Sequence, residues 1–219
     1  MGTRDRIVAA AAQLYGRYGY TGVGLKQVAA ESGSPIGSLY HFFPGGKEEL
    51  AAAALRMSGA GYQMLVEGIL ENMPDLVSGI EQSFALAAET VASTGYVDAC
   101  WIETVALEVA STSEPLRTVT AEIFEQWVDS CTAWVESHGV APERARELGI
   151  AYVTGLEGAF ILARSLRSRE PLLATGRMLA AAAREALAAP ASKPVKATRG
   201  PGGVPLTRAA RAAKGGARR

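Results

Sequence analysis

The amino-acid sequence predicts an all-α protein, with three small N-terminal helices, a larger antiparallel helical bundle and a basic C-terminal tail. Apolar residues recur at three- and four-residue spacing through most of the chain, and no segment alternates apolar and polar residues as a half-buried strand does. Proline and glycine stand at the ends of the periodic segments, which predicts about nine helices.

Charge divides the chain into three parts, although the formal net charge is zero. Residues 1–56 contain six Lys/Arg and four Asp/Glu, residues 57–189 contain eight and eighteen, and residues 190–219 contain eight and none. We take these parts as an N-terminal domain, a helical bundle and a tail. The tail is rich in Pro, Gly and positive charge and lacks large apolar residues, so we expect it to be disordered.

Composition also bears on location and chemistry. No apolar run reaches the roughly 18 residues of a membrane span, and the N-terminus leads into a charged amphipathic helix rather than a signal peptide. Cys100 and Cys131 lack metal-ligand spacing, which favours two buried thiols in a cytoplasmic protein. We find no nucleophile, phosphate-loop or metal-binding pattern, and therefore expect no enzyme, no cofactor and no metal.

The first three helices are predicted from their apolar spacing and their glycines. Helix one ends at Gly19, and helix two ends at Gly33. We expect Ser34 to cap helix three and Pro35 to occupy its first position. The apolar positions of helices one and two are Ile7, Ala10, Ala11, Leu14, Tyr15, Tyr18, Leu25, Val28 and Ala29.

The remaining helices are predicted mainly from Pro and Gly. Helix four runs from Lys47 to about Asn72, softened by Gly59 and Gly61. Helix five opens at Pro74 and ends at Gly95; helix six covers about 98–112, with Leu107 or Val109 inward. Glu114-Pro115, Pro142-Glu143 and Glu170-Pro171 open helices seven, eight and nine, and Gly139 ends helix seven.

Helix three has an unusual composition for so short a segment. Gly37 and Ser38 keep one face small, and Tyr40 and His41 place hydrogen-bonding groups beside it. Leu39 and Phe43 lie four residues apart and can face a core together. Such a helix suits close approach to a phosphate-lined groove, as in a helix-turn-helix, and the motif spans residues 24–43.

The first fifty residues resemble the TetR family of transcriptional regulators, without a gap. The 43–47 link, Phe-Pro-Gly-Gly-Lys, further resembles the LmrA/YxaF-like subgroup. Two positions depart from the family pattern: Gly24 replaces a frequent Ser or Thr, and Pro35 replaces a polar residue. The matching residues are Ile7, Ala11, Leu14, Tyr15, Gly19, Tyr20, Val28, Ala29, Gly33, Gly37, Leu39, Tyr40, Phe43, Lys47, Glu48 and Leu50.

The resemblance implies a DNA-binding surface on the first helices and the start of helix four. Tyr40, His41 and Lys47 resemble residues that contact backbone phosphates, while Gly37 and Ser38 lie nearest the base edges. An ordinary helical hairpin remains the alternative for this segment. The resemblance implies DNA contacts for Lys26, Gln27, Ser34, Pro35, Ile36, Gly37, Ser38, Tyr40, His41 and Lys47.

The bundle offers candidates for an effector site, although aromatic residues at helical spacing are core residues by default. Glu157 is the only charged residue between Glu147 and Arg164, so a buried carboxylate needing a partner is expected there. An acidic bundle rich in aromatic residues favours an apolar or cationic small molecule. The candidate ligand-binding residues are Phe84, Trp101, Glu103, Trp127, Tyr152 and Glu157.

The expected function is a ligand-responsive, sequence-specific regulator, in the family's usual mode a repressor released from a palindromic operator by a small molecule. A homodimer through helices eight and nine is expected, using the apolar helix eight and the alanine-rich stripe 179–183. The alternatives are a ligand-pocket protein or enzyme whose first helices are structural, and a general nucleic-acid coating protein. The effector, the operator and the choice between repressor and activator stay open.

Overall fold

A computed structural model describes residues 1–97 and 100–188, and these ranges contain nine α-helices and no strand. The all-α prediction is therefore confirmed for the described residues. The predicted disorder of residues 190–219 and the predicted start of helix six at Asp98 lie outside them. The helices are α1 (Thr3–Tyr18), α2 (Leu25–Glu31), α3 (Ile36–Phe42), α4 (Gly46–Glu71), α5 (Leu76–Ser93), α6 (Trp101–Val109), α7 (Glu114–Ser137), α8 (Pro142–Leu166) and α9 (Glu170–Ala188).

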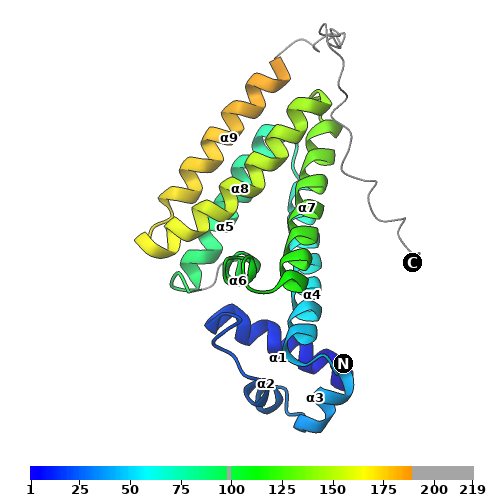
Figure 1. The fold of residues 1–219 in the computed structure, drawn as a ribbon. Coiled ribbons are helices and arrows are strands. Elements are labelled where there is room, and N and C mark those ends of the chain that lie inside the picture. The colour runs from blue at the N-terminus through cyan, green and yellow to red at the C-terminus, as the bar shows by residue number, and fades with distance from the viewer. Residues whose placement is uncertain (98–99, 189–219) are drawn as a thin grey trace, which may run out of the picture.

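The three small helices α1 to α3 form one end of the molecule, and α4 leads from them into the bundle (Figure 1). In the bundle, α4 packs on α7, α7 on α8, and α9 on both α5 and α8. The short α6 contacts both α1 and α7, so it joins the two ends of the fold (Figure 1). Because α4 crosses the predicted boundary at residue 56, the two domains share one helix, and the boundary itself stays a prediction.

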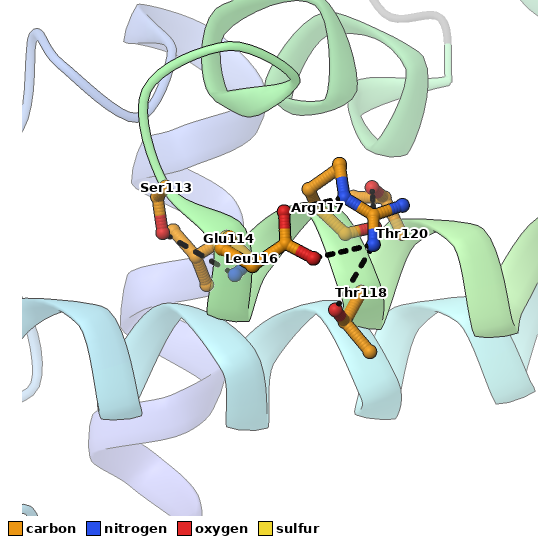
Figure 2. Close-up of polar contacts among 6 residues, drawn as sticks. All are labelled: Ser113, Glu114, Leu116, Arg117, Thr118 and Thr120. Carbon is orange, nitrogen blue, oxygen red and sulfur yellow. Dashed lines mark hydrogen bonds and ion pairs between the residues drawn. The ribbon is translucent and has the colours of Figure 1, made fainter. Parts of the chain in front are cut away.

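Side-chain caps fix two helix starts. The Asp75 carboxylate accepts a hydrogen bond from the Ser78 amide at 2.9 Å, so α5 is capped by Asp75 and begins at Leu76; Pro74 only precedes it. Ser113 caps α7 in the same way by accepting from the Leu116 amide at 3.3 Å (Figure 2). A capping side chain satisfies an amide that has no partner inside the helix.

The glycines of α4 differ in their surroundings. The helix continues unbroken through Gly59 and Gly61. Gly59 is buried against α7, where an added Cβ would lie 2.8 Å from Cγ2 of Ile123. Its carbonyl accepts a hydrogen bond from the indole Nε1 of Trp127 at 3.0 Å. Gly61, by contrast, has no atom within 4 Å of an added Cβ. Gly59 therefore allows α4 and α7 to approach closely.

The exposure of individual side chains shows which of the predicted core residues are buried. On α6, Val109 is buried and Leu107 is exposed, which settles the alternative left open by the sequence. Both Cys100 and Cys131 are buried free thiols. In the stripe 179–183, Ala180 and Ala183 are fully buried within the chain, so these two residues pack in the core, and the homodimer through helices eight and nine stays a prediction. None of the described helices is both long and apolar enough to span a membrane.

Candidate DNA-binding surface and candidate effector cavity

The turn between α2 and α3 is built by backbone hydrogen bonds. Gly33 has a positive φ of 60°, as predicted, and its amide donates to the Ala30 carbonyl at 3.2 Å. The Ser34 amide donates to the Ala29 carbonyl at 3.0 Å, which completes the glycine-based helix ending known as a Schellman motif.

This ending explains why the predicted start of α3 is wrong by one residue. Ser34 belongs to the end of α2, where its buried hydroxyl donates to the Ser32 carbonyl at 3.3 Å. Pro35 has φ −58° and ψ 142°, and it is the N-cap of a helix that begins at Ile36. Ser34 therefore does not cap α3, and its side chain does not lie on the exposed face of the motif.

Most of the other candidate DNA contacts are exposed. Leu39 and Phe43 are buried in the core of the small domain, which fixes the orientation of α3. Gly37 has open space where a Cβ would stand, and Ser38 is half-buried. The exposed residues are Lys26, Gln27, Pro35, Ile36, Gly37, Tyr40 and His41.

Lys47 is half-buried at the start of α4. Its Nζ is 4.4 Å from the centroid of the Tyr20 ring, a cation–π arrangement. Burial lowers the pKa of Lys47, and the nearby Glu108 carboxylate acts in the opposite direction. Its ammonium group therefore faces both an aromatic ring and a carboxylate.

Glu108 connects α6 to the small domain directly. One carboxylate oxygen accepts a hydrogen bond from the Tyr20 amide at 3.1 Å, and the other accepts from the Thr21 amide at 2.7 Å. The neighbouring Gly19 has φ 73°, and an added Cβ would lie only 2.1 Å from Oε1 of Glu108. The loop after α1 is thus held by a side chain from the bundle.

A cavity of about 480 Å³ lies among α4, α5, α7 and α8, within the size range of drug-sized ligand sites. Its wall is mostly apolar and aromatic. Three of the predicted ligand-binding residues, Trp127, Tyr152 and Glu157, line this cavity.

The other three candidates do not line it. Phe84 packs its ring edge against Tyr152, with centroids 5.2 Å apart, and its Cβ faces Gly176 of α9. Trp101 faces α1, where its ring lies 6.3 Å from that of Tyr15. Glu103 is half-buried on α6, off the cavity wall. Helical periodicity marks these residues as inward but does not tell which neighbouring element they meet.

The α4 contribution to the wall was missed by the sequence reasoning. Tyr62, Val66 and Ile69 line the cavity together. Their spacing of four and three residues places them on one face of α4, and this was the signal that could have revealed them. The ring of Tyr62 lies 6.0 Å from that of Trp127, so the two aromatic residues form part of one wall.

Glu157 has a distinctive environment. Burial raises its pKa to about 7, while the Cys100 thiol hydrogen-bonds to its carboxyl group and acts in the opposite direction. Its Oε2 atom is buried without a hydrogen-bond partner. A buried, unpartnered carboxyl oxygen is costly, which makes it a functional candidate. Within residues 1–97 and 100–188, no group of three or more His, Cys, Asp or Glu side chains could hold a metal ion.

Comparison with known proteins decides the family. The pattern "Bacterial regulatory proteins, tetR family" matches residues 7–54, and "Transcriptional regulator LmrA/YxaF-like, C-terminal domain" matches residues 77–178. The chain is 34% identical to the uncharacterized HTH-type transcriptional regulator YxaF of Bacillus subtilis, across 78% of this chain and 90% of that protein. The chain belongs to the TetR family. It is a DNA-binding transcriptional regulator with an LmrA/YxaF-like C-terminal domain.

Other relatives agree with this assignment. The HTH-type transcriptional regulator LmrA of Bacillus subtilis is 30% identical over 78% of this chain and 91% of its own length. A TetR transcriptional regulator from Chloroflexus aurantiacus has a similar structure, with a TM-score of 0.69, 26% identity, and coverage of 82% and 92%. Reduced NemR of Escherichia coli shares the fold, with a TM-score of 0.70 at 23% identity over 81% of this chain and 94% of NemR. The TetR family comprises transcriptional regulators rather than enzymes.

Proposed function

We propose that this TetR-family regulator represses transcription by binding a palindromic operator through α3, and that a small molecule in the cavity releases it. The observation that carries the proposal is the arrangement of α3. Buried Leu39 and Phe43 anchor the helix, while Gly37, Tyr40 and His41 are exposed together. A helix without a side chain at Gly37 can approach base edges closely, and Tyr40 and His41 can donate to flanking phosphates. Since its target is operator DNA, the protein would act in the cytoplasm.

Lys26 and Gln27 on α2, together with Pro35, Ile36 and Ser38, would complete the contact surface. Lys47 would add a phosphate contact near the start of α4, where the helix dipole favours an anion. To reach DNA, its ammonium group must extend beyond the Tyr20 ring on which it now rests. Ser34 would contribute through the geometry of the turn rather than through its buried hydroxyl.

The proposed effector is an apolar or cationic small molecule. An apolar wall with the rings of Tyr62 and Trp127 supports an apolar body, and Glu157 supports a cationic group. Trp127 also donates to the Gly59 carbonyl of α4. A ligand that displaces Trp127 would therefore act on the helix that leads to the DNA-binding domain.

The proposed homodimer uses α8 and α9. Gly158, Leu162 and Leu166 follow one another at four-residue spacing on α8, and all three are exposed in the single chain. Met178 and Leu187 of α9 are exposed as well. Apolar side chains exposed on two adjacent helices suit an isologous four-helix interface, which would give a twofold protein for a twofold DNA site.

Selection of bound DNA from a random double-stranded pool tests the proposal. The full chain should enrich a palindrome whose half-sites lie one DNA turn or a multiple of it apart. A Gly37→Trp variant should enrich no such sequence, because the indole would occupy the space needed for the groove. Enrichment of random sequences by the wild-type chain would refute sequence-specific repression and favour non-specific coating.

A further inference from the structure

The polar groups of the cavity wall differ in whether they have hydrogen-bond partners within the protein. Gln63 and Ser130 both donate to the Glu67 carboxylate, at 2.8 and 2.6 Å. The Tyr152 hydroxyl donates to Ser83 at 2.8 Å. Together with the indole of Trp127, these groups find partners within the protein. Glu157 stands apart, because its buried Oε2 has no hydrogen-bond partner.

The surroundings of Glu157 are short of positive charge. The N-terminal end of α6 brings the Cys100 thiol and the Glu103 carboxyl group toward it. Glu103 raises the pKa of Glu157, as a nearby like charge does. Burial raises the pKa of Glu103, and the smaller effect of Arg164 on α8 lowers it. Glu157 is thus the carboxyl group on the cavity wall, with a second carboxyl group near it, while the guanidinium of Arg164 acts on that second group.

We propose that the cavity takes an apolar molecule carrying one basic amine, whose ammonium group pairs with the carboxylate of Glu157. The inference rests on the proposed function. It specifies an effector that is both apolar and cationic, whereas the proposed function requires only one of these properties. The ammonium group supplies the hydrogen-bond donor and the positive charge that the wall lacks. The apolar body fills a cavity of about 480 Å³, beside the rings of Tyr62 and Trp127.

The pairing has a consequence for pH. In the free protein burial raises the pKa of Glu157 to about 7, so a neutral and a charged form coexist near neutral pH. The cation binds the charged form and lowers this pKa, so binding releases a proton. Affinity for the amine should therefore rise by about tenfold from pH 6 to pH 8, and then level off while the amine itself stays protonated.

Three probes with one skeleton test the inference: phenylbutylamine, phenylbutanol and phenylbutyrate. Their binding to the full chain can be followed by tryptophan fluorescence without DNA, because Trp127, one of the three tryptophans, lines the cavity. Wild-type protein should bind the amine roughly tenfold or more tighter than the alcohol, and the acid most weakly. Glu157→Gln should reduce the amine-to-alcohol ratio to about one, whereas Glu143→Gln, an exposed change on the same helix, should leave it unchanged.

Calorimetry of the wild-type protein in two buffers of different ionisation enthalpy should also reveal proton release on amine binding, independently of whether the variant folds. Equal binding of amine and alcohol, tighter binding of the acid, a ratio that persists in Glu157→Gln, or no binding of the amine at millimolar concentration would each overturn the inference. None of these outcomes touches operator recognition, which the DNA selection tests separately.

Discussion

Glu108 should tie the bundle to the DNA-binding domain, and its removal should be measurable as a loss of stability. Its two carboxylate oxygens accept from the Tyr20 and Thr21 amides at 3.1 and 2.7 Å. A hydrogen bond to a charged group contributes about 1.5–3 kcal/mol, but water can replace the carboxylate at the exposed Thr21 amide. We therefore expect Glu108→Ala to lower the free energy of unfolding by about 1–2 kcal/mol in total.

Urea denaturation followed by circular dichroism measures this change, and hydrogen exchange locates it. A loss of this size corresponds to a fall in Tm of roughly 2–8 °C for a chain of this length. The amides of Tyr20 and Thr21 should exchange faster in Glu108→Ala, while Leu107→Ala, an exposed change one residue away, should leave both observables unaltered. Unchanged stability together with unchanged exchange at these two amides would refute the assignment of Glu108 as a connection between the domains.

Two further predictions concern packing and assembly. Gly59→Val should lower the free energy of unfolding by about 1–3 kcal/mol in urea denaturation, because a Cβ would lie 2.8 Å from Ile123. Gly61→Ala should raise it by up to about 1 kcal/mol, because the space around Gly61 is open. Equal effects of the two substitutions would contradict the packing argument. Leu162→Asp should convert the proposed dimer to monomers in sedimentation at micromolar protein, because it buries a charge in the α8–α9 interface; a dimer that survives would place the interface elsewhere.

The fold was predictable because glycine and proline mark most helix ends. Gly19 and Gly33 both have positive φ, as their places after apolar-periodic segments predict. The start of α3 was less predictable, since Ser34 can either cap the following helix or complete the turn that ends the preceding one. Both choices satisfy local hydrogen-bonding groups, and only the three-dimensional turn decides between them.

The candidate effector site was predictable only in part. Glu157 stood out because a single charge in a long apolar helix predicts burial, and its carboxyl group is indeed buried at the cavity. Trp101 was equally prominent in the sequence, yet it packs on α1. Periodicity predicts which face of a helix points inward, but not which element that face contacts. For Trp101 the contact with α1 follows from the packing of α6 between the two ends of the fold.

Operator affinity of two variants tests the central claim, recognition of DNA through α3, most directly. Fluorescence anisotropy would compare the selected palindrome with a scrambled duplex over a range of salt. Lys47→Ala should weaken binding to both duplexes and reduce the salt slope by about one per chain, since it removes one phosphate contact. Gly37→Trp should abolish the preference for the palindrome. Unchanged operator affinity in both variants at moderate salt would contradict the claim.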